Sequence, residues 1–162
     1  MALAYTLPRL PQRLNLRGKH VLVRVDFNVP CNGTKIADDF RILKTLPLLR
    51  HLQKRGARLV LLSHLTEKKD HRSFKPILAA LEKICRTSFL FAHTPEEVLE
   101  YRLRNIPTPI LLENLRSFSG EEKNNRAFAK RLASLGDIYV NEDFSQSHRS
   151  YASIITLPKL LP

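Results

Sequence analysis

Two polar side chains suited to recognising a hydroxyl group follow an apolar run near the start of the chain. The run begins at His20, and Asp26 and Asn28 stand where it gives way to polar residues. Because they are two residues apart, these side chains face the same side of an extended chain. A carboxylate and an amide on one side supply acceptors and donors to a single ligand. The spacing therefore predicts a pocket that reads the hydroxyl group of a small molecule.

Basic side chains stand at comparable positions later in the chain. His64 follows a second apolar run, Arg116 follows a fourth, and His148 and Arg149 follow a fifth, while Arg41 stands at the start of a predicted helix. Guanidinium groups bind carboxylate and phosphate oxygens in bidentate fashion. Ligands of open parallel sheets lie beyond the carboxyl ends of the strands. If these runs are strands of one such sheet, the side chains form a cationic cluster for a small polyanion.

Three of the candidates also have a purely structural explanation. Asp26 can pair with a neighbouring arginine, His64 can be a histidine of the core, and Arg116 can cap a carbonyl group. Any one of these explanations is plausible alone. Their joint occurrence at the ends of apolar runs favours a binding site, because a basic chain without one would scatter its charges.

The elements that must position these residues alternate between strands and helices. Such alternation predicts an α/β fold, a three-layer Rossmann-like parallel sheet with helices on both faces, in a single lobe. The predicted strands are His20–Phe27, Arg58–Ser63, Ser88–Ala92, Pro109–Asn114 and Asp137–Asn141.

Four helices are predicted between the strands. The first is capped by Asp38 or Asp39, runs to about Arg55 and ends at Gly56, with an inward face of Ile42, Leu43, Leu46, Leu49 and Leu52. The others are a helix from the cap Ser73 to Cys85, a third from Thr94 to Arg104, and a fourth from Glu121 to Leu135.

Length and composition fit one globular domain. The chain has 162 residues, of which 43% are hydrophobic and 26% charged, and it holds no apolar run long enough to span a bilayer. The N-terminus lacks the pattern of a secretory signal, so the expected location is the cytoplasm. Cys31 and Cys85 lack a partner at metal-ligand spacing and are expected to be reduced thiols. The net charge of +12 predicts attraction to polyanions without choosing among them.

The glycine content argues against a nucleotide site. Only five glycines occur, and neither a Gly-x-Gly-x-x-Gly nor a Gly-x-x-x-x-Gly-Lys-Ser/Thr motif is present. No cofactor or metal is therefore expected in this chain.

Four motifs in order resemble the N-terminal half of phosphoglycerate kinase. They are Arg24–Pro30, Leu62–Leu65, Leu111–Arg116, and Leu132–Asn141 followed by His148 and Arg149. The resemblance runs from about Leu14 to Leu157, and it implies that residues 1–162 form the substrate-binding lobe of that family, without the nucleotide lobe.

The family transfers a phosphoryl group between 1,3-bisphosphoglycerate and Mg-ADP in glycolysis. By resemblance, Asp26 and Asn28 contact the hydroxyl and neighbouring oxygens of 3-phosphoglycerate or 1,3-bisphosphoglycerate, and the basic patch consists of Arg41, His64, Arg116 and Arg149. Arg41 is the residue nearest to the transferred phosphoryl group, which makes it the catalytic candidate. The Mg-ATP or Mg-ADP site of the intact enzyme belongs to the absent lobe, so a separate nucleotide-binding lobe is the implied partner and no independent catalysis is expected.

Two segments depart from the family pattern. Thr66, Glu67 and Lys68 replace Gly-Arg-Pro, which puts an acid where an anion-binding arginine is usual. Ser145 replaces a glycine and Tyr151 replaces a second histidine in the last motif. Ser145 is expected to be strained if its position requires a positive φ. Glu67 opposes the binding of an anion, whereas Lys68 or Lys69 can compensate from the next positions, so the net effect on affinity stays open.

Other roles stay open at this point. The chain can be a fragment, one half of a split gene, or a non-catalytic paralogue on the same fold. A nucleic-acid-binding module is the alternative suggested by +12 and by the extra basic residues Lys54, Arg55, Arg58, Lys68, Lys69, Arg102 and Arg104. Aromatic residues make up only 7%, with no Trp, which disfavours base stacking and hence nucleic acid as a partner.

Overall fold

A five-stranded parallel sheet forms the centre of the molecule. The structure is a computed structural model, which describes residues 11, 13–66 and 73–162. The strand order is β5-β6-β4-β1-β7, and every neighbouring pair in this sheet is parallel. The strands are β1 (His20–Arg24), β4 (Arg58–Leu62), β5 (Leu90–Ala92), β6 (Ile110–Leu112) and β7 (Ile138–Asn141). All five predicted strands are present, and each is shorter than predicted.

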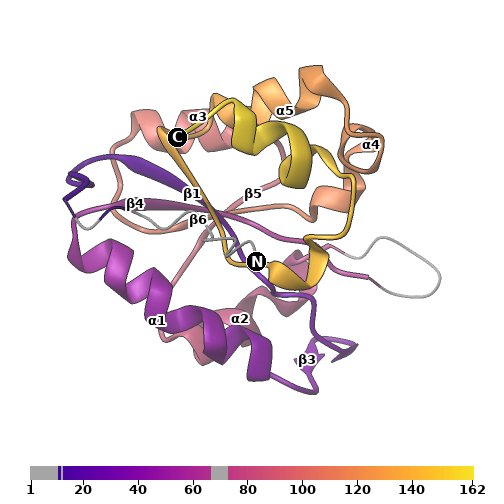
Figure 1. The fold of residues 1–162 in the computed structure, drawn as a ribbon. Coiled ribbons are helices and arrows are strands. Elements are labelled where there is room, and N and C mark those ends of the chain that lie inside the picture. The colour runs from indigo at the N-terminus through magenta and orange to yellow at the C-terminus, as the bar shows by residue number, and fades with distance from the viewer. Residues whose placement is uncertain (1–10, 12, 67–72) are drawn as a thin grey trace, which may run out of the picture.

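Helices cover both faces of the sheet (Figure 1). The helices α1 (Phe40–Lys54) and α2 (Leu78–Cys85) lie on one face, and α3 (Pro95–Leu103) and α5 (Arg126–Ala133) lie on the other. Strand residues alternate between the two layers, since Val21 and Val23 join the core under α1 and α2 while Leu22 joins the other core. This arrangement confirms the predicted three-layer fold.

The ends of two helices follow their sequence signals. Gly56 adopts a φ of 82° after α1, a conformation that glycine takes without strain. The hydroxyl of Thr94 accepts a hydrogen bond from the backbone N–H of Glu97 at 3.3 Å and so caps α3. On α1, however, Leu43 is 46% exposed, so the prediction that it faces inward was wrong.

The predicted helix from Glu121 to Leu135 is two helices. The helix α4 (Ser119–Glu122) ends before a turn in which Asn124 has a left-handed φ of 48°. The side chain of Asn125 then accepts a hydrogen bond from the N–H of Phe128 at 3.0 Å and starts α5. Asparagine favours both turns and N-caps, and this local preference breaks the longer helix.

Short elements complete the described chain. An antiparallel pair that the sequence did not predict joins β2 (Cys31–Asn32) to β3 (Lys35–Ile36). Single turns of 3-10 helix are η1 (Lys75–Ile77), η2 (Leu115–Ser117), η3 (Phe144–Gln146) and η5 (Leu157–Lys159), and η4 (Ala152–Thr156) is a π-helical turn. Among the described residues, no helix is both long enough and apolar enough to cross a membrane.

Candidate anion-binding site at the carboxyl ends of the strands

The loops after β1, β4, β6 and β7 meet at one edge of the sheet. Parallel pairing brings this about, because β1 lies between β4 and β7, and β6 lies beside β4. The backbone of β1 is held beyond its end, since the N–H of Val25 donates to the carbonyl of Leu62 at 2.9 Å. The chain then leaves the sheet, and Asp26 and Asn28 therefore stand on the loop after β1 rather than within a strand.

Asp26 and Arg41 form an ion pair at this edge. The Nη1 atom of Arg41 donates to both carboxylate oxygens of Asp26, at 3.2 and 2.9 Å. The Arg41 side chain is 46% exposed and the Asp26 side chain 16%. The structural explanation of Asp26 is thus correct in this state, and it also places the two predicted site residues side by side. An exposed pair of this kind contributes little to stability, so its partners remain available to a ligand.

A second chain of hydrogen bonds links all four loops. The side-chain oxygen of Asn28 accepts from the N–H of Thr66 at 2.9 Å. The Thr66 hydroxyl in turn accepts from Nη1 of Arg116 at 2.5 Å, and Nη2 of Arg116 donates to the side-chain oxygen of Gln146 at 3.3 Å. Arg116 bonds side chains rather than capping a carbonyl, and it lies within 3.6 Å of a Glu122 carboxylate oxygen. The predicted residues Asn28 and Arg116 therefore belong to one network.

His148 and Arg149 follow this network along the chain. The N–H of Arg149 donates to the carbonyl of Gln146, whose side chain contacts Arg116, at 2.8 Å. Both residues are exposed. Within the described ranges Arg149 has no carboxylate partner.

A shallow hollow of about 170 Å³ opens beside the Asp26–Arg41 pair. Its border includes Lys44 from α1 and Glu142 and Phe144 from the segment after β7. Burial raises the pKa of Glu142 above its ordinary value. Lys44 adds a cation that sequence reasoning did not single out.

His64 lies below the cluster rather than in it. It is 1% exposed, and its Nδ1 is 3.4 Å from a carboxylate oxygen of Asp143. Burial lowers the pKa of His64, the contact with Asp143 opposes this shift, and Arg24 and Arg116 add to it, so the imidazole is neutral near pH 7. In this state the burial of His64 and its contact with Asp143 fit the core explanation, and its place in the basic patch stays a prediction.

A buried ionic network supports the cluster from beneath, and sequence reasoning missed it. Arg24 is 1% exposed and pairs through Nη1 with the fully buried Asp143, while its Nε donates to the Ser153 hydroxyl at 2.8 Å. Ser153 also contacts the buried carboxylate of Glu121 through both its hydroxyl and its N–H. The signal in the sequence was Arg24 itself, because an arginine inside an apolar strand requires a buried acceptor.

The ionisation of this network follows from its contacts. Burial opposes a charge on Asp143, but contacts with His64, Arg24 and Ser145 outweigh it, and the pKa of Asp143 is lowered. Burial dominates at Glu121 and raises its pKa, although Ser153 and Arg24 oppose the shift. Asp143 is thus the charged partner of Arg24.

The departures from the family pattern have different outcomes. Tyr151 lies under Arg116, whose guanidinium carbon is 5.6 Å from the ring centroid, so the phenol supports the cation in place of a histidine. Ser145 belongs to η3 and is not among the residues with positive φ, so the expected strain is absent there. Glu67, Lys68 and Lys69 lie outside the described residues.

The fold and this edge define a class of protein: an open, parallel α/β domain with guanidinium groups gathered at the carboxyl ends of its strands. Across residues 11, 13–66 and 73–162, no group of three or more His, Cys, Asp or Glu side chains is arranged to hold a metal ion. Guanidinium groups and hydrogen-bond donors are therefore the chemistry that the described edge offers to a ligand.

Comparisons with known proteins identify the family. The family model described as phosphoglycerate kinase matches residues 12–162. The chain is 43% identical over 157 residues to a phosphoglycerate kinase of Bartonella tribocorum, covering 92% of this chain and 39% of the relative. A relative from Rubrobacter xylanophilus is 43% identical over 158 residues, covering 92% and 40%. This chain belongs to the phosphoglycerate kinase family, and it spans about two fifths of the length of these curated relatives.

Solved structures agree with this assignment. Phosphoglycerate kinase from Coxiella burnetii superposes with a TM-score of 0.70 at 33% identity, covering 87% of this chain and 36% of that one. Phosphoglycerate kinase from Pyrococcus horikoshii gives a TM-score of 0.74 at 25% identity, covering 92% and 40%.

Proposed function

We propose that this chain is the phosphoglycerate-binding, N-terminal lobe of a phosphoglycerate kinase. Its ligand is 3-phosphoglycerate or 1,3-bisphosphoglycerate, and a separate nucleotide-binding lobe is needed for the kinase reaction. The observation that carries the proposal is the pair of linked networks, Asp26–Arg41 and Asn28–Thr66–Arg116, which meet at one edge of the sheet.

Each residue has a role that fits its chemistry. Asp26 accepts a hydrogen bond from the glycerate hydroxyl, and Asn28 contacts a neighbouring oxygen. Arg41, Arg116 and Arg149 neutralise the carboxylate and phosphate charges, for which planar guanidinium groups are well suited. Exchange of the Asp26 partner of Arg41 for an anionic ligand costs little, because the pair is partly exposed.

Arg41 is the candidate for a direct catalytic role. Phosphoryl transfer depends mainly on positioning and on neutralising the charge of the equatorial oxygens, and it needs no covalent intermediate with the protein. A guanidinium next to the hydroxyl-binding carboxylate can hold the acyl-phosphate end of the ligand. His64 contributes by packing as a neutral ring under the loops rather than by charge.

The residues present do not fit a magnesium–nucleotide complex. No glycine-rich phosphate loop occurs in the sequence, and the described residues contain no carboxylate cluster of the kind that holds a divalent cation. Mg-ATP chemistry is therefore assigned to the second lobe.

Isothermal titration with 3-phosphoglycerate at low ionic strength tests the proposal. We expect saturable binding that weakens with salt, and Arg41→Ala is expected to weaken it by about tenfold or more, the effect of a charged hydrogen bond. Arg126→Ala is the matched control, because Arg126 is exposed on α5 and its substitution removes the same charge. The absence of both heat and thermal shift at millimolar ligand contradicts the proposal.

Two further measurements separate the alternatives. Kinase activity that appears only after a separately expressed nucleotide lobe is added supports a split enzyme, whereas binding without restored activity supports a non-catalytic paralogue. A gel shift at physiological salt tests the nucleic-acid role. Several of the extra basic residues are already engaged, as Arg102 donates to the Ser134 carbonyl at 2.6 Å and Arg58 pairs with Asn105, so tight binding of nucleic acid is not expected.

A further inference from the structure

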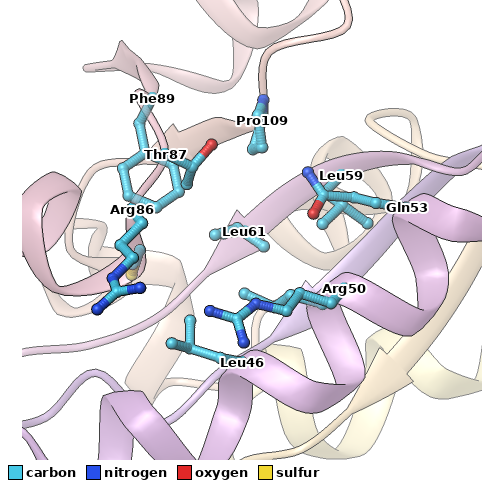
Figure 2. Close-up of a pocket in the computed structure, with 11 residues that line it drawn as sticks. Leu46, Arg50, Gln53, Leu59, Leu61, Arg86, Thr87, Phe89 and Pro109 are labelled. Carbon is cyan, nitrogen blue, oxygen red and sulfur yellow. The ribbon is translucent and has the colours of Figure 1, made fainter.

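A second pocket lies at the edge of the sheet opposite to the anion cluster. Its volume is about 230 Å³, and Figure 2 shows its lining residues. Strand register places this pocket, because Ile110 of β6 pairs with Val60 of β4 and with Leu90 of β5. The residues directly before these three, Pro109, Leu59 and Phe89, line the pocket. The pocket therefore lies at the amino ends of β4, β5 and β6 and shares no lining residue with the proposed substrate site.

The floor of this pocket is apolar. Leu59 and Leu61 are alternate residues of β4 and so point to the same face, where they meet Leu46 and Leu49 of α1 and Phe89. These five side chains belong to one buried cluster. These side chains are almost fully buried, and the polar residues Gln53 and Thr87 line the pocket beside them. A ligand there meets a small apolar surface next to polar groups.

The mouth of the pocket is cationic. Arg50 of α1 and Arg86, which follows α2 in a left-handed conformation with φ 54°, are both exposed lining residues. Their side chains extend toward the same opening in Figure 2. Neither guanidinium has an acidic partner in the part of the chain that the structure describes, and no acid lines the pocket.

Two neighbouring groups do not offset this charge. The Glu82 carboxylate of α2 accepts a hydrogen bond from the N–H of Phe89 at 2.8 Å and is held there. Cys85 lines the wall as a neutral thiol, since burial raises its pKa to about 11 despite the opposing effect of Arg50. The pocket thus combines an apolar floor with two uncompensated guanidinium groups.

We propose that this pocket binds a small organic monocarboxylate with a compact apolar body of about six carbon atoms. A dry cavity of about 150 Å³ holds one benzene ring, so 230 Å³ has room for one six-membered ring and the carboxylate attached to it. The ring contacts the leucines and Phe89, and the carboxylate lies between Arg50 and Arg86. This site is independent of the proposed kinase function.

The ends of α1 and α2 make the two arginines decisive. Both helices end at this edge, so the partial negative charge of their last carbonyl groups disfavours an anion there. Without Arg50 and Arg86, the apolar floor should accept a neutral ring more readily than a charged one. Ligand preference therefore reports the role of the guanidinium groups separately from the shape of the pocket.

Ligand-observed and protein-observed NMR titrations of the whole chain test this proposal. Cyclohexanecarboxylate is the probe, with cyclohexanecarboxamide as the neutral analogue and acetate as the anion without a ring. We expect a dissociation constant on the order of 1 mM for the probe, at least about tenfold weaker binding of both controls, and shifts confined to residues near Leu46 and Phe89. Addition of 3-phosphoglycerate should not displace the probe.

Arg50→Gln and Arg86→Gln complete the test. Each variant should weaken probe binding by about tenfold, and the double variant should bind the amide at least as well as the acid. Arg126→Gln, on the opposite face of the sheet, should leave binding unchanged. Because these side chains are exposed, the variants are expected to fold. Equal binding of acetate and probe, shifts elsewhere, or binding indifferent to both arginines overturns the proposal.

Discussion

Asp143→Ala tests the buried network beneath the candidate site. The substitution leaves Arg24 charged and 1% exposed, without its ion-pair partner. Removing one partner of a buried ion pair costs about 3–5 kcal/mol, because the remaining charge is not compensated. The Ser153 hydroxyl still accepts from Nε of Arg24 and Glu121 lies beyond it, so the lower part of this range applies.

The loss is large compared with the stability of the domain. The free energy of unfolding of a domain of this size is about 5–15 kcal/mol, so the variant stays folded at low temperature. The melting temperature should fall on the order of 10 °C, at about 2–4 °C per kcal/mol for this chain length. Urea unfolding followed by circular dichroism at 25 °C measures the difference, and an unchanged m-value shows that the compactness of the native state is kept.

A double variant separates the ion pair from simple packing. Arg24→Met removes the buried charge while keeping a long apolar side chain, so the combination with Asp143→Ala should be more stable than Asp143→Ala alone. If Asp143→Ala lowers the free energy of unfolding by less than about 1 kcal/mol, the reasoning is refuted, because burying an unpaired guanidinium costs more than that. The reasoning is also refuted when the double variant loses as much free energy of unfolding as the two single variants lose together.

Three further outcomes can be measured. His64 has a lowered pKa in the folded chain, so the unfolded chain binds the proton of this imidazole more readily. The contribution of His64 to stability is therefore full above about pH 6.5 and declines as the pH falls through the lowered pKa. Urea unfolding at pH 5 and at pH 7.5 measures this decline. A Cβ at Gly136 would stand 2.7 Å from Leu22, so Gly136→Ala should cost about 1–3 kcal/mol, and an unchanged unfolding midpoint contradicts this overpacking. Cys85 is buried with a pKa raised to about 11, so a thiol reagent at pH 8 should label it only on unfolding, and labelling at the rate of a free thiol contradicts its burial.

The order of the strands and helices was predictable because burial leaves a direct trace in the sequence. A segment such as Arg58–Leu62 is apolar on both faces, as expected for a strand covered by helices on each side. Strand ends were less predictable. The polar residues Asp26 and Asn28 continue the alternation of an extended chain, although the backbone has already left the sheet there.

Local side-chain chemistry explains the error at the fourth predicted helix. The apolar positions between Glu121 and Leu135 permit a single helix, and nothing in their spacing requires a break. The break comes from Asn124 and Asn125, one in a left-handed conformation and one capping the next helix. Periodicity records which face is buried, and it does not record where the backbone groups find their partners.

The sequence predicted which residues come together at the candidate site, but it did not predict which of their side chains are charged. Topology alone brings together the loop that carries Asp26 and Asn28, the start of α1 with Arg41, and the turn η2 with Arg116. The state of His64 depends on Asp143, which is distant in sequence, and on the depth at which the ring is buried. Such long-range pairings leave little trace in a single sequence, apart from the presence of an arginine inside a strand.

The distribution of acids decides which arginines an anion can recruit. Arg24 is matched by Asp143 in the buried interior, and breaking that pair is expensive, so its charge is not available at the surface. Arg41 is matched by Asp26 where water screens both groups, and Arg116 is 3.6 Å from the exposed Glu122, so both pairs open at low cost. We therefore propose that a ligand with two or three negative charges draws on Arg41, Arg116 and Arg149 rather than on Arg24. Among the described residues, Arg149 has no carboxylate partner.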